Sequence, residues 1–160
     1  MNNELLNLAE RIRAELQDIE QVVQRIQSQW NRFQPTRDDA YLDGVALNLH
    51  GFYEGLERLF FLVAATIDKK QPQGSEWHPG LLVQMQGELP GIRPAVISEV
   101  SRRARDKFRG FRHGVRHIYT FNLDAQQTSK LVADVAPLFK CLRDELSIFA
   151  DFLEARATAE

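Results

Sequence analysis

Cysteine is almost absent from this sequence of 160 residues, in which Cys141 stands alone. A single cysteine forms no intrachain disulfide and no zinc site built on cysteines. Long hydrophobic runs are missing too, because the longest purely apolar run, residues 59–65, falls far short of the ~20 residues that span a bilayer. Residues 1–4 lack the basic and apolar segments of a secretory signal. We therefore expect a soluble protein of the reducing cytoplasm.

The period-two alternation of a half-buried strand is also lacking over any useful length. Apolar residues recur every three or four positions instead, which predicts amphipathic helices. Pro35 is expected to end the first helix, Thr36 with Asp39 to cap the second, and Pro137 to kink or break the last. The expected elements are four long helices, over about residues 5–33, 37–68, 94–120 and 125–153, and a short helix over about residues 81–85. We expect an all-α, antiparallel helical bundle that forms a single domain over residues 1–160.

Charge is unevenly distributed along the chain. The segment 102–117 holds seven basic residues and one acid, so it carries +6 and leaves −8 for the rest of a chain whose net charge is −2. Such a local basic stretch on an acidic body can attract a polyanion.

Five arginines of the fourth helix fall on one stripe when the helix is projected at 100° per residue. The stripe lies beside an apolar seam that begins with Ile97 and Val100, and Tyr119 continues it. Its members are Arg102, Arg105, Arg109, Arg112 and Arg116. A solvated basic face is the simplest interpretation, but like charges spaced i,i+4 destabilise a helix unless something anionic lies across them.

The motif Arg112-x4-His117-x-Tyr119 lies within this stripe, and with it the chain resembles the HEPN superfamily, in particular HepT-like ribonuclease toxins. The similarity extends to three further runs. They are Leu47-Asn48-Leu49-His50-Gly51-Phe52-Tyr53, Trp77-His78 and Arg93-Pro94-Ala95-Val96. The resemblance implies an endoribonuclease toxin that is held in check by a minimal nucleotidyltransferase antitoxin. It also implies that the antitoxin transfers AMP to Tyr119.

The motif residues suit RNA cleavage without a metal or a cofactor, because the 2′-hydroxyl of RNA is itself the nucleophile. We assign proton transfer to His117, since histidine titrates near neutral pH, and phosphate binding to Arg112. RNA binding is assigned to the rest of the stripe and to His113. On this chemistry DNA is not cleaved. His113 and His117 have a metal-binding spacing, but no third ligand is evident.

Arg112 and His117 are five residues apart, which places them about 140° apart around an ideal helix. Three explanations stay open: the helix loosens near Gly114, the long side chain of Arg112 bends around the helix, or two protomers share one cleft. The resemblance favours the last, since HEPN toxins are typically homodimers.

Two other functions compete with the toxin. One is a non-catalytic HEPN module that binds a nucleotide or a nucleotidyltransferase, which has no need of a proton-transfer group at His117. The other is a helical dimerisation protein without a ligand, against which the arginine stripe argues. His50 and His78 are interpreted as core or cap histidines, with substrate contact the minority view for His78.

Overall fold

The computed structural model describes residues 2–75, 77–117 and 123–160, and for residues 109–117 it describes the backbone alone. Apart from one β-bridge between Leu89 and Arg93, all regular structure in these residues is helical. This confirms the predicted all-α bundle. The elements are α1 (Asn3–Thr36), α2 (Asp39–Val63), a π-helical turn η1 (Ala64–Asp68), α3 (Trp77–Gln86), α4 (Glu99–His117) and α5 (Ala125–Ala159).

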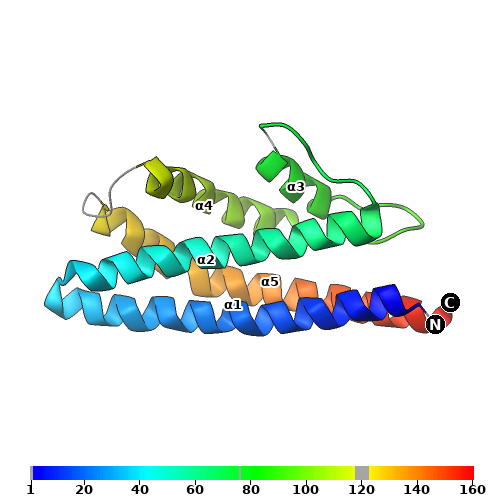
Figure 1. Ribbon diagram of the computed structural model, residues 1–160, viewed down its shortest axis with the longest axis horizontal. Helices are drawn as coiled ribbons and strands as arrows, with labels where there is room; N and C mark the ends of the chain where they lie inside the picture. Colours follow the sequence, from blue (N-terminus) through cyan, green and yellow to red (C-terminus); the bar gives the residue numbers. More distant parts are fainter. Residues whose placement is uncertain (1, 76, 118–122) are drawn as a thin grey trace.

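The long helices α1, α2 and α5 run side by side and enclose most of the apolar core (Figure 1). In this view α3 and α4 lie on the opposite side of α2 from α1. The two ends of the chain meet, because the Asn2 N–H donates to the Ala157 carbonyl at 3.1 Å. None of the described helices is long and apolar enough to cross a membrane.

The predicted ends of the first two helices are close to the observed ones. Helix α1 ends one residue beyond Pro35, and Arg37 closes it in a left-handed conformation with φ 53°. The predicted cap of α2 was wrong, however. Asp38 is the N-cap, since its carboxylate accepts from the Ala40 N–H at 3.0 Å, while the Thr36 hydroxyl donates back to the Arg32 carbonyl of α1.

Helix α4 begins at Glu99 and not near Pro94 as the sequence predicted. The preceding residues turn back onto the end of α3, where the N–H groups of Val96 and Ile97 both donate to the Met85 carbonyl. Both side chains are buried there. The Ser98 hydroxyl then caps α4 by accepting from the Ser101 N–H at 3.2 Å.

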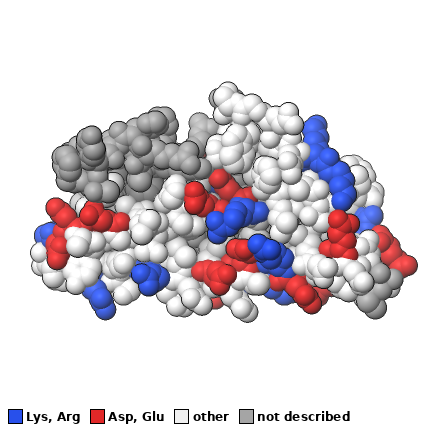
Figure 2. Space-filling model, in the orientation of Figure 1, with Lys and Arg blue, Asp and Glu red and all other residues white. Residues whose placement is uncertain are grey.

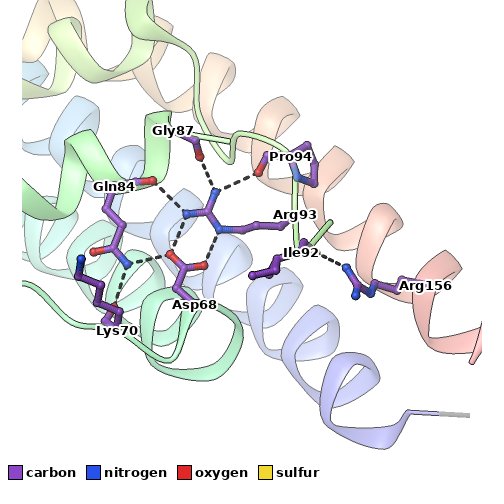
Figure 3. A network of polar contacts seen from close by, with 8 residues as sticks. All are labelled: Asp68, Lys70, Gln84, Gly87, Ile92, Arg93, Pro94 and Arg156. Carbon is purple, nitrogen blue, oxygen red and sulfur yellow. Dashed lines mark hydrogen bonds and ion pairs between the residues drawn. The ribbon is translucent and has the colours of Figure 1, made fainter. Parts of the chain in front are cut away.

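The turn between α3 and α4 is held by a buried ion pair between Arg93 and Asp68, whose side chains are 0% and 2% exposed (Figure 3). The guanidinium donates Nε to one Asp68 oxygen at 2.6 Å and Nη2 to the other at 2.7 Å. Its remaining N–H groups reach the carbonyls of Gly87, Pro94 and Gln84. All five donors of Arg93 therefore have an acceptor, which is the condition under which a buried charge is well tolerated.

Asp124 is the N-cap of the last helix, α5. The Asp124 carboxylate accepts from the N–H groups of Gln126 and Gln127 at 2.8 and 3.4 Å. Helix α5 continues through Pro137, so of the kink or break predicted there, the break does not occur.

Candidate functional site

Helix α4 carries the Arg112 and His117 positions, and its backbone is α-helical from Glu99 to His117. This continuity disfavours a loosening of the helix at Gly114. At 3.6 residues per turn, five residues correspond to about 140° around the axis. The two motif positions therefore lie on different faces of one helix, which leaves the bent arginine arm and the cleft shared by two protomers as explanations.

Arg102 and Arg105, the two arginines of the stripe whose side chains are described, face the bundle. Arg102 donates from Nε to the Gln86 side chain of α3, and Arg105 is 1% exposed. Ser101 and Phe108 are buried beside Arg105, whereas Val100, predicted to belong to the core face, is 74% exposed. The buried face of α4 is thus rotated from the predicted apolar seam toward the arginines.

Arg105 joins α4 to α2 through two hydrogen bonds and a ring contact. Its Nη1 donates to the Tyr53 hydroxyl at 2.7 Å and its Nη2 donates to Glu57 Oε1 at 2.9 Å. The guanidinium carbon also lies 3.6 Å from the centre of the Tyr53 ring, within cation–π range. A side chain enclosed in this way holds α4 against α2, and the RNA-binding role expected for Arg105 stays a prediction.

Glu57 extends the same network to α3. Its Oε1 lies 2.5 Å from His78 Nδ1, so one carboxylate links Arg105 of α4 to His78 of α3. The Trp77 ring lies against the imidazole, tilted by 31° with ring centres 3.5 Å apart, and Phe61 of α2 packs edge-on against Trp77. The His78 side chain keeps 22% of its surface exposed, so the network reaches from the interior to the surface.

Electrostatics favour the charged form of Glu57. Burial acts to raise its pKa, but the hydrogen bond and positive charge of Arg105, with His78 adding to them, outweigh burial and hold the pKa of Glu57 below its ordinary value. The site therefore contains a fixed negative charge beside a histidine, the arrangement that orients an imidazole for proton transfer.

The other predicted site residues fall where no side chain is described. The backbone positions of Arg109, Arg112, His113, Arg116 and His117 lie on α4, and their side chains are outside the described part of the structure. Tyr119 lies outside the described residues altogether. Arg112 is seven residues beyond Arg105, so its position is within about 20° of Arg105 around the helix axis. It occupies the face of α4 that, one and two turns earlier, packs on α2 and α3.

Sequence reasoning missed Tyr53 and Glu57 and placed His78 among packing histidines. One signal was present in the sequence. Glu57 interrupts the apolar run of the second helix, and a carboxylate at a core position needs a cationic partner. The identity of that partner was hidden, because Arg105 is 48 residues away in the chain.

A groove of about 580 Å³ adjoins this network along α1 and α2. Leu59, Phe61 and Leu62 contribute its apolar surface, and Glu57 and Trp77 also line it. Figure 2 shows acidic and basic side chains interspersed over α1 and α2, with no continuous basic patch among the described side chains on that face. The described side chains over α1 and α2 therefore form no basic patch comparable to the basic segment 102–117 of the sequence.

His50 and His78, the histidines whose side chains are described, each pair with a glutamate. His50 Nε2 lies 3.0 Å from Glu54, much as His78 binds Glu57. Within the described ranges, no three His, Cys, Asp or Glu side chains gather closely enough to hold a metal ion.

Comparison with protein families gives a match to this chain. The model of a family described as HepT-like protein matches residues 44–153, well over half of the chain. The matched region begins within α2 and includes α3, α4 and most of α5. No curated protein and no solved structure matches.

Proposed function

This chain belongs to the HepT-like family of the HEPN superfamily, and we propose from that premise that it is a metal-independent endoribonuclease toxin. Its partner in this proposal is a minimal nucleotidyltransferase antitoxin. The observation that carries the proposal is the extent of the family match, which includes the whole of α4 with Arg112 and His117 and also Tyr53, Glu57, His78 and Arg105.

In the proposed reaction the 2′-hydroxyl oxygen attacks the adjacent phosphorus and the bond to the 5′-oxygen breaks. His117 transfers a proton, and Arg112 donates hydrogen bonds to the phosphate oxygens as charge accumulates on them. The products are a 2′,3′-cyclic phosphate and a 5′-hydroxyl. DNA lacks the nucleophile and is not a substrate.

Substitution of the motif residues tests the catalytic proposal. We expect Arg112→Ala and His117→Ala to abolish cleavage of RNA and growth toxicity, while the circular dichroism spectrum stays helical. Cleavage by the unaltered protein is expected to persist in a chelator. Full activity of the His117→Ala protein, or an absolute need for a divalent ion, contradicts the mechanism. If the unaltered protein binds RNA without cleaving it, the non-catalytic HEPN module becomes the better account.

For silencing, we propose that the antitoxin transfers AMP to Tyr119. The arginines of the stripe bind the added phosphate, and the adenine fills the cleft. The modified toxin therefore carries a covalently attached group that resembles its RNA substrate. Tyr119→Phe should remain toxic and escape neutralisation when the antitoxin is co-expressed. An unmodified Tyr119 peptide in the mass spectrum of a fully silenced toxin would favour steric masking by a bound partner instead.

A further inference from the structure

Cleavage of RNA through its 2′-hydroxyl moves two protons on opposite sides of the phosphate. One proton leaves the attacking 2′-oxygen, and another must reach the 5′-oxygen that departs roughly in line with it. The motif of α4 contains one residue assigned to proton transfer, His117. Its position lies about 140° around the helix from that of Arg112, away from the face that packs on α2 and α3.

His78 is the histidine found on the α2 and α3 side. Its Nδ1 lies 2.5 Å from Glu57, and Glu57 is fixed in turn by Arg105 of α4 at 2.9 Å. Contact with the tilted ring of Trp77 restrains the ring plane. The imidazole is thus oriented by a carboxylate and a neighbouring ring, yet 22% of its side chain remains exposed. The Arg112 position lies about 10 Å along α4 from Arg105, on the same face.

We propose that His78 is a second catalytic residue of the ribonuclease, the general acid that protonates the leaving 5′-oxygen. This inference rests on the proposed function. The 2′-oxygen forms its bond to phosphorus as His117 removes its proton. The phosphorus–5′-oxygen bond breaks, and the proton on His78 Nε2 moves to that oxygen to give the 5′-hydroxyl. Each histidine then exchanges one proton with water and returns to its starting state.

The charges around His78 suit the role of an acid. Glu57 of α2 accepts from Nδ1 and places a negative charge beside the imidazole. Arg105 of α4 and the Tyr53 hydroxyl of α2 face the same carboxylate and keep it in place. A histidine held by a carboxylate in this way is a common element of proton-transfer sites.

A substrate that needs no acid tests the proposal. Replacing the 5′-oxygen at the cleavage site by sulfur creates a leaving group that departs as a thiolate without being protonated. For His78→Ala we expect cleavage of ordinary RNA to fall by about 10²–10⁴-fold, the usual contribution of a positioned acid. The same protein should cleave the sulfur-containing RNA at nearly the rate of the unaltered enzyme, which also shows that it is folded.

His50→Ala is the matched control, because it also removes a half-buried histidine from a pair with a glutamate, Glu54. It should cleave both substrates normally. Equal losses on both substrates in the His78→Ala protein, or no loss on ordinary RNA, overturn the assignment of His78 while leaving the proposed function intact. An unaltered protein that produces no cyclic phosphate from either substrate overturns the proposed function itself.

Discussion

Arg105 carries a permanent positive charge into the bundle, where its side chain is 1% exposed. The charge is balanced by Glu57, which is itself buried, and the planar guanidinium also covers the ring of Tyr53. Both ions lose most of their hydration in this position, so each depends on the other. The pair fixes the helix that carries the motif against α2.

Removing the Arg105 side chain should therefore destabilise the folded protein. We expect Arg105→Ala to lower the free energy of unfolding by about 3–5 kcal/mol, because the buried Glu57 loses its permanent cation while His78 stays beside it. Arg103 is the control on the same helix: its side chain is 71% exposed and pairs with Glu99 one turn away. Arg103→Ala should change stability by less than about 1 kcal/mol. Urea unfolding measures both, and equal effects would show that the buried pair is not important for stability.

The lowered pKa of Glu57 predicts a dependence of stability on pH. A carboxylate whose pKa is lower in the folded than in the unfolded protein stabilises the fold above the unfolded value, 4.5, and loses this effect as the pH falls through the folded value. The unfolding free energy should therefore decrease on acidification below about pH 4.5, and less steeply in Glu57→Gln. Identical pH profiles for the two proteins, measured by denaturant titration from pH 7 to pH 3, would contradict this account.

The turn between α3 and α4 depends in the same way on Arg93 and Asp68, which join it to the end of η1. Lysine has no planar fork and cannot replace all five hydrogen bonds of Arg93. We expect Arg93→Lys to destabilise the protein by about 1–3 kcal/mol and Arg93→Ala by about 3–5 kcal/mol. Arg156→Ala serves as the control, since Arg156 donates to carbonyls of the same turn from a side chain that is 37% exposed. An Arg93→Lys protein as stable as the unaltered one would exclude the proposed anchoring.

Helices were predictable from the sequence because their apolar residues recur at helical spacing whatever the partners are. The start of α4 was not predictable from the sequence. Pro94 suits a first helical turn, and only the contact of Val96 and Ile97 with the end of α3 shows that the helix begins later. The orientation of α4 was missed for a related reason. From sequence alone, an arginine is assigned to the surface unless a buried partner is known. The partners of Arg105 are 48 and 52 residues away in the chain. The motif was recognisable from spacing, whereas the Glu57–His78 pair exists only in the folded chain.

In the assembled protein, the separation of Arg112 and His117 around α4 favours a cleft made by two protomers. We expect the purified protein to be a dimer with α4 near the two-fold axis. Mixing inactive Arg112→Ala and inactive His117→Ala chains should then restore activity, because a heterodimer keeps one site in which both residues are intact. Each variant assayed without the other is the control. A strictly monomeric enzyme with full activity would rule out the shared cleft.

In the proposed reaction, this chain cleaves RNA through the 2′-hydroxyl of its substrate. The most direct measurement uses an RNA oligonucleotide with one mapped cleavage site, and the same oligonucleotide with a single 2′-deoxy residue just before the scissile phosphate. In the presence of a chelator, we expect cleavage of the first to a 2′,3′-cyclic phosphate and a 5′-hydroxyl, and no cleavage of the second at that site. Cleavage of the deoxy-substituted oligonucleotide at the mapped site, or products ending in a 5′-phosphate, would contradict it.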